Sequence, residues 1–471
     1  MSTEEWGAYA QVIMVAVGLA ALVSVAFLAP VLVRVFLLAQ VVYWGLSFVV
    51  RPVVLLVALP SPRFADSVAD PRLAYTGYGY SIREVLHPIA ISIWLYVLVV
   101  LLAVALLRRY ATSATTSTDR VSRPGTTGPG TDLLTTFGVA YVIGTMARAA
   151  SYLSGSAGQA GDVSSANPYL DLVGNFAGLS ALGLIAFYRH RRTEGTVAVI
   201  VVLLGGELVW GILTESKTPL LGAALAVAIR FALEGYTRRQ FLATAVGGVA
   251  LLGAFSWLQS FKVSDATELA SAAADSGYPP LVRPFLSLIR RFDLLEASTD
   301  VWYMDGRSWI SPVFTAKNMI VNLIPSQLGV EKFQSGTQWA QTVRGSSVDM
   351  RGISVSLAEG HLNEGLLIGG YPGVIAESVF VIAMILLVAR FLRSNTMLLL
   401  VPALGFVAFP SLFERGALGI TETLGKVIQL AIALFVLNIV VTWFRRRASI
   451  AAAPRHLDSK ISVPTPVGGS S

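Results

Sequence analysis

The chain of 471 residues contains no cysteine, which excludes disulfide bonds, thiolate metal sites and a cysteine nucleophile. It has only four histidines and no HEXXH zinc signature, so we expect no metal site. The motifs GxxxxGKS/T and GxSxG are also absent, which leaves ATP hydrolysis and serine-hydrolase chemistry without local support.

Charged residues are scarce as well. They make up 13% of the chain, about half the share usual in soluble proteins, whereas hydrophobic residues make up 54%. Apolar runs of roughly 18 or more residues recur, and each is long enough to cross a bilayer as a helix. The net charge of +7 does not indicate nucleic acid, because the arginines lie at the ends of apolar runs. We therefore predict an all-α polytopic membrane protein that contacts the lipid bilayer and binds no nucleic acid.

The apolar runs predict about eleven membrane-spanning helices. We place them at residues 7–29, 31–59, 88–107, 132–151, 170–188, 196–213, 219–233, 241–259, 366–389, 396–413 and 425–444. The chain then divides into four parts: helices one to eight within 1–259, a large polar loop at 260–365, helices nine to eleven within 366–444, and a tail at 445–471. The tail is polar and rich in proline, which predicts disorder.

Basic clusters orient these helices. Each of five clusters follows an odd-numbered span: Arg108/Arg109, Arg189–Arg192, Arg238/Arg239, Arg390/Arg393 and Arg445–Arg447. Basic residues near membrane spans favour the cytoplasmic side, so the N-terminus is predicted outside and the C-terminus inside. The acidic start MSTEEWG lacks the basic region of a signal peptide, and we expect the first span to be retained. The large loop is then extracytoplasmic.

Cations of this outer face are candidate phosphate ligands, because the planar guanidinium group makes bidentate contacts with phosphate oxygens. Residues Val282–Ala297 predict an amphipathic helix whose arginines share one face and could lie against lipid headgroups. The alternative interpretation is that a large outer loop simply carries solvated charges. The outer cations are Lys217, Arg283, Arg290, Arg291, Arg307, Lys317, Arg344, Arg351 and Arg415.

Candidate catalytic groups lie at the end of the loop. Glu359, His361 and Glu364 fall within six residues, directly before the ninth predicted span. A carboxylate or an imidazole can act as the general base for a reacting hydroxyl. Asp293, earlier in the loop, is a further candidate. The alternative is that this segment is only a helix N-terminus, in which the acids interact with the helix dipole and Asn363 caps the first turn.

Two ionisable residues lie inside predicted spans. Glu207 interrupts the apolar sequence LLGGELVWG, and Arg34 lies in the second span. Intramembrane charges often mark transport pathways, which keeps a lipid or solute transporter open as an alternative function. The other interpretation is that each residue pairs inside the helix bundle.

Four segments carry a resemblance to a known family. They are Arg290–Gly329, Ala358–Val374, the FERG sequence at Phe413–Gly416, and TESKTPLL at Thr214–Leu221. They resemble the Wzy-type O-antigen (bacterial polysaccharide) polymerases, a family related to O-antigen ligases. The architecture of many spans with one large outer loop before the last few is also similar. Two residues depart from the family pattern: Lys217 replaces an arginine and Glu364 replaces an aromatic residue.

The resemblance implies a glycosyltransferase of the family C architecture in the bacterial cytoplasmic membrane. Such an enzyme transfers a growing glycan from a polyprenyl-pyrophosphate carrier to a lipid-linked repeat unit and needs no nucleotide cofactor. The pyrophosphate would be held by Arg290, Arg291, Lys217 and Arg415. Two further candidates, which no motif supports, are Arg344 and Arg351. Glu359 is the first candidate base and His361 the second. A flippase and a chain-length regulator are the protein partners implied. A ligase that uses the same donor remains an alternative.

Overall fold

The computed structural model describes residues 3–62, 68–114, 130–155, 168–190, 193–214, 216, 218–234, 275, 277–290, 292–325, 328–350, 355–409 and 411–452. Within these ranges the regular structure is helical, which agrees with the predicted all-α class. In this described part of the chain, eight helices are long and apolar enough to cross a membrane. They are α1 (Thr3–Leu28), the continuous α2–η1–α3 (Val31–Gly45, Leu46–Val50 and Arg51–Ala58), α5 (Tyr78–Ala114), α6 (Thr131–Leu153), α7 (Pro168–Phe187), α8 (Thr193–Leu213), α16 (His361–Phe391) and α19 (Ala417–Ala452).

Two further predicted spans form shorter helices. The seventh corresponds to α9 (Thr218–Glu234), and the tenth to α17 (Met397–Ala408) followed by the four-residue α18 (Ser411–Glu414). The eighth prediction, 241–259, lies outside the described residues, as does most of the tail. The total of eleven spans therefore stays a prediction.

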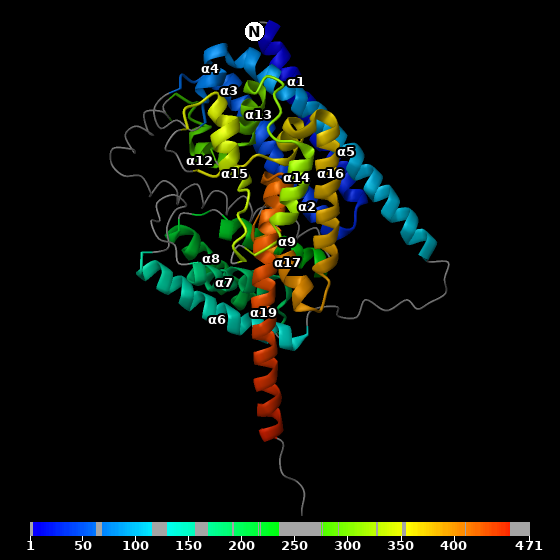
Figure 1. Cartoon of the computed structure of the whole chain (residues 1–471), viewed down its shortest axis with the longest axis vertical. Helices are drawn as coiled ribbons and strands as arrows, with labels where there is room; N and C mark the ends of the chain where they lie inside the picture. Colours follow the sequence, from blue (N-terminus) through cyan, green and yellow to red (C-terminus); the bar gives the residue numbers. More distant parts are fainter. Residues whose placement is uncertain are drawn as a thin grey trace, which may run out of the picture.

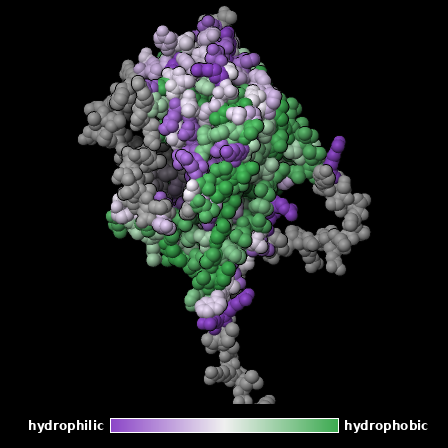
Figure 2. Space-filling view, viewed as in Figure 1, coloured by the Kyte–Doolittle hydropathy of each residue, from purple (hydrophilic) through white to green (hydrophobic). Residues whose placement is uncertain are grey.

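Helices α16 and α19 run along the length of the molecule, and α1 and α5 slant away from the end where the N-terminus lies (Figure 1). Helix α6 crosses the lower half obliquely, with α7 and α8 labelled beside it. Short helices gather at the end where the N-terminus lies, among them α4 (Pro71–Thr76), α12 (Leu286–Ile289), α13 (Leu294–Tyr303) and α15 (Ser335–Gln338). The visible surface is mostly hydrophilic at that end and hydrophobic over the helices below it (Figure 2). These short helices form a polar cap on one end of an apolar helix bundle, and this cap is named the outer region for its place at the end of the molecule.

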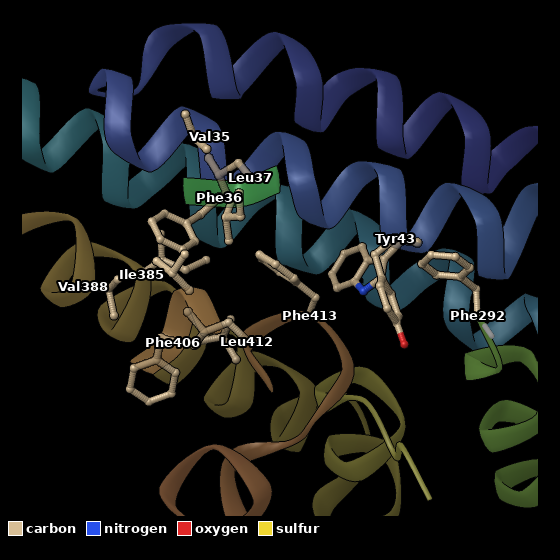
Figure 3. Packing of buried hydrophobic residues seen from close by; sticks show 14 of the residues in the cluster. Val35, Phe36, Leu37, Tyr43, Phe292, Ile385, Val388, Phe406, Leu412 and Phe413 are labelled. Carbon is tan, nitrogen blue, oxygen red and sulfur yellow. The ribbon is translucent and has the colours of Figure 1, made fainter. Parts of the chain in front are cut away.

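The core joins the first helices to the last ones (Figure 3). Phe36 of α2 meets Phe413 of α18 with ring centroids 6.4 Å apart, and Tyr43 of α2 meets Phe292 of the large loop at 4.9 Å. All four rings are buried. This packing fixes the segment around Phe413 against α2, and so sets the position of the residues that follow it.

Arg34 has a structural role that its sequence position did not reveal. Its guanidinium group donates hydrogen bonds to the carbonyl oxygens of Ala26, Phe27 and Ala29, at 3.3, 3.0 and 3.4 Å. The last carbonyls of a helix have no partner within the helix, and Arg34 supplies one for the end of α1. Arg34 therefore caps the C-terminal end of α1.

The predicted amphipathic helix at 282–297 is wrong. The structure has a 3₁₀ turn at Arg283–Phe285, the short α12, and a new helix that begins only at Leu294. The carbonyl oxygen of Asp293 accepts from the amides of Glu296 and Ala297, at 2.9 and 3.3 Å, and starts α13. Leu286 and Ile289 are buried on α12, and Leu294 and Leu295 are buried on α13. Two separate helices thus supply the core contacts, and Arg283 and Arg290 do not lie on one continuous helix.

Helix α16 begins five residues before the predicted ninth span and contains a sharp break. Gly369 and Gly370 have non-helical backbone angles, and Gly370 has a φ of 62° and a ψ of −145°, which favours glycine. The two turns before the break fold back against the turn that follows it. The backbones are so close there that a Cβ at Gly373 would lie 2.2 Å from the carbonyl oxygen of Gly365. The large loop therefore ends at Gly360, followed by a short helical arm.

Candidate functional site

Glu359 and Arg415 meet where the large loop joins the last helices. Nη1 of Arg415 lies 3.1 Å from Oε2 of Glu359, and Ser335 Oγ donates to Oε1 of the same carboxylate at 2.9 Å. Glu359 is fully buried, whereas the Arg415 side chain is 24% exposed. Arg415 also donates to the carbonyl oxygen of Leu357 at 2.9 Å and to Ser356 Oγ at 3.1 Å. A candidate base and a candidate phosphate ligand, 56 residues apart in sequence, thus form one ion pair.

Electrostatics keep this arginine charged. Burial alone would lower the pKa of Arg415, but the negative charges of Glu359 and Glu414 outweigh that effect and leave the pKa raised. Glu414 is itself held in place, since Tyr43 donates a hydrogen bond to its carboxylate at 3.2 Å. The site therefore holds a permanent positive charge with one partly open side.

Two more glutamates lie against the start of α19. The amide of Ala417 donates to Oε2 of Glu377 at 2.9 Å, and the amide of Leu418 donates to Oε1 of Glu364 at 3.3 Å. Helix N-termini favour negative groups, because their first amides lack partners in the helix. Gly416 is needed here, since a Cβ at this position would lie 1.8 Å from Oε2 of Glu364. The glycine of the FERG sequence thus lets a buried carboxylate approach the helix.

His361 and Asn363 are placed differently from either prediction. His361 is 1% exposed and packs between Trp44 and Tyr96, with both ring centroids 5.3 Å away. Neither imidazole nitrogen has a hydrogen-bond partner among the residues that the structure describes. Asn363 does not cap α16; it lies inside the helix, where it accepts from Ser298 Oγ at 2.9 Å. Gly360 occupies the N-cap position instead. Glu359 is therefore the better placed of the two candidate bases.

A second charge cluster, which the sequence did not reveal, lies in the outer region around Asp300. This fully buried carboxylate pairs with Arg72 at 2.7 Å and with Arg344 at 3.1 Å, and accepts from Trp339 Nε1 at 3.0 Å. Burial lowers the pKa of Arg72 and of Arg344, but their acidic partners outweigh it and leave both pKa values raised. The outer charge network comprises Arg51, Asp70, Arg72, Glu296, Asp300 and Arg344.

The other predicted phosphate ligands that the structure describes do not converge with Arg415. Arg344 belongs to the outer charge network, Arg290 forms an ion pair with Asp275, and Arg283 donates to the carbonyl oxygen of Tyr278 at 2.8 Å. Asp293, the third candidate catalytic residue, precedes α13 and contacts neither Glu359 nor Arg415 through any described hydrogen bond. Lys217, Arg291 and Arg351 lie outside the described residues.

Glu207 pairs inside the bundle, as the second interpretation of the sequence expected. Nη1 of Arg148, on α6, lies 2.7 Å from Oε1 of Glu207, and Nη2 lies 3.3 Å from Oε2. Glu207 is 1% exposed. A guanidinium group is the natural partner for a buried carboxylate, because both planar groups match in a bidentate contact. The Glu207 carboxylate is thus neutralised within the helix bundle.

Comparison of the chain with protein-family models, curated proteins and solved structures found no match in any of the three. Function must therefore be inferred from the residues and their geometry. The Glu359–Arg415 pair is the feature that combines a candidate base with a candidate anion ligand.

Proposed function

We propose that this protein is a membrane glycosyltransferase that polymerises lipid-linked glycan repeat units, with Glu359 and Arg415 at its reaction centre. The observation that carries the proposal is their direct contact, which joins the end of the large loop to the residue that follows α18. A substrate with a long lipid carrier and a polar head needs both a polar and an apolar environment. The outer region supplies polar groups, and the helices below supply an apolar surface.

The chemistry requires few groups. The hydroxyl oxygen of the acceptor sugar bonds to the anomeric carbon of the donor glycan, while the bond from that carbon to the pyrophosphate oxygen breaks. Glu359 accepts the hydroxyl proton, and the electron pair of the broken bond stays on the leaving pyrophosphate. Arg415 stabilises the negative charge that develops there. No redox partner or nucleotide takes part.

Access to the pair depends on α15. Ser335 covers one oxygen of Glu359, and a Cβ at Gly336 would lie 2.3 Å from Nη1 of Arg415. In this proposal α15 moves aside when substrate binds, and its contacts with Glu359 are replaced by those of the acceptor hydroxyl. The membrane is the bacterial cytoplasmic membrane, the N-terminus is outside, and a flippase and a chain-length regulator are the protein partners.

The proposal is tested with the full-length protein in lipid nanodiscs, supplied with purified lipid-linked repeat units. We expect glycan chain growth with the native protein and a loss of about 100-fold or more with Glu359→Gln, as is typical for removal of a general base. Arg415→Lys keeps the charge but loses the planar contact, so a partial loss is expected. Glu331→Gln is the matched control, because Glu331 is an exposed glutamate of the large loop and makes the same change of charge.

Other outcomes would favour the alternatives. Product that forms only when a separate acceptor is added indicates a ligase. Solute or lipid transfer across the bilayer without glycan transfer indicates a transporter. Full activity of Glu359→Gln, with normal expression and membrane insertion, would contradict the assigned reaction centre.

A further inference from the structure

A second polar site lies between α6, α7, α8 and α9, away from the Glu359–Arg415 pair. It is a cavity of about 260 Å³. This volume is close to the lower end of small-molecule pockets, which begin at about 300 Å³. The cavity therefore fits one small ring better than a lipid tail or an oligosaccharide. Its polar lining includes Arg148, Asn175, Glu207, Trp210, Ser216 and Thr218.

The lining has little net charge. Arg148 and Glu207 neutralise one another through their bidentate contact, and the guanidinium carbon of Arg148 lies 5.0 Å from the ring centroid of Trp210. A phosphate would be repelled by the Glu207 carboxylate. A cation would be repelled by the Arg148 guanidinium group. The charge pattern thus favours an uncharged ligand with hydrogen-bonding groups.

Neutral polar groups complete the lining. Asn175 of α7 is half-buried, and its side-chain amide forms no hydrogen bond within the described part of the chain. Its amide offers both a donor and an acceptor. Ser216 and Thr218, from the turn between α8 and α9, add hydroxyl groups. An amide, hydroxyls and an Arg–Glu pair beside an indole ring together match a molecule with several hydroxyls and one apolar face.

We propose that this cavity binds a single saccharide ring. Sugar hydroxyls can hydrogen-bond to Asn175 and to the Arg148–Glu207 pair, and the C–H face of the ring can pack on Trp210. The inference deepens the proposed function, on which the choice of a sugar over another small polyol rests. Phe409 also lines the cavity and precedes Arg415 by six residues in the sequence, so one segment of the chain contributes to both sites.

Binding is measured by saturation-transfer difference NMR on the full-length protein in nanodiscs, with methyl glycosides of glucose, galactose, mannose and N-acetylglucosamine as probes. We expect saturation transfer to at least one glycoside. Asn175→Leu should weaken the affinity for the glycoside about fivefold, since one hydrogen bond contributes roughly 1 kcal/mol. The saturation transfer should fall accordingly. Trp210→Leu should reduce it as well. Inorganic pyrophosphate, added as a competitor, should not displace the glycoside.

The matched control is Ser180→Ala, a buried polar residue of the same helix α7 that does not line the cavity. It should leave saturation transfer unchanged. Absence of transfer to every glycoside, equal transfer in Asn175→Leu, or displacement by pyrophosphate would each overturn the inference. The assay involves no catalysis, so a protein that binds glycosides but elongates no glycan would contradict the proposed function and leave this site standing.

Discussion

Glu359 and Arg415 depend on each other for stability as well as for the proposed chemistry. Glu359 has no exposed surface, and Arg415 supplies its only described ion pair. We expect Arg415→Ala to destabilise the fold by about 3–5 kcal/mol, because it leaves a buried carboxylate without its charge partner. The double variant Glu359→Gln/Arg415→Met should regain part of that loss. Thermal unfolding in detergent measures both, and equal melting temperatures for the single and double variants would contradict the coupling.

Individual residues near the site show what a sequence can reveal. Glu359 and Arg415 were identifiable because each lies in a polar, glycine-containing run at the edge of an apolar span. His361 lies in the same run, but its burial between Trp44 and Tyr96 arises from helices far away in sequence. Arg148 was missed, because an arginine near the end of an apolar run is also the pattern of an interfacial residue.

At the scale of elements, the break in α16 determines where Glu364 and Glu377 lie. Gly370 occupies a backbone conformation that costs other residues about 1–3 kcal/mol, so we expect Gly370→Ala to destabilise the protein by that amount. Gly369→Ala is the matched control. Its φ of −157° lies outside the left-handed region, and apart from its chain neighbours no described heavy atom lies within 4 Å of the position its Cβ would take. Similar losses in the two variants would show that the break does not depend on the conformation of Gly370.

The outer region depends on the charge network around Asp300. Asp300→Ala leaves Arg72 and Arg344 beside each other with less compensating negative charge. We expect the free energy of unfolding to fall by about 3–5 kcal/mol. Limited proteolysis should then cleave the 260–365 loop faster than in the native protein. Lys317→Ala, an exposed change in the same loop, should alter stability by no more than about 0.5 kcal/mol. Equal cleavage rates in both variants would refute this role for the network.

Elements of the membrane part were largely predictable, because long apolar runs leave few alternatives to a helix. The elements of the outer loop were not. The segment at 282–297 has helical periodicity, yet its backbone breaks before α13 so that apolar residues on both sides enter the core. The Arg72–Asp300 contact joins residues 228 positions apart, and nothing local in either segment indicates its partner.

For the whole molecule, orientation in the membrane is the first property to test. The absence of cysteine means that single cysteines can be introduced without first removing any. Tyr75→Cys, at a side chain 91% exposed in the outer region, should react with a membrane-impermeant maleimide on intact cells. Asn395→Cys, in the turn between α16 and α17, should react only after the membrane is permeabilised. The reverse pattern would contradict an external N-terminus.

The outer charge network has a consequence for the molecule in salt solution. Its three acids and three arginines carry no net charge, and their described contacts are 2.7–3.2 Å long. Ionic screening at 0.1 M salt acts over about 10 Å, so it has little effect on charges that are already matched at contact and shielded from water. The network also contributes little electric field to the surrounding solution. A change in substrate capture with ionic strength would therefore reflect the charges of the substrate and of the exposed surface, while the outer region keeps its folded structure.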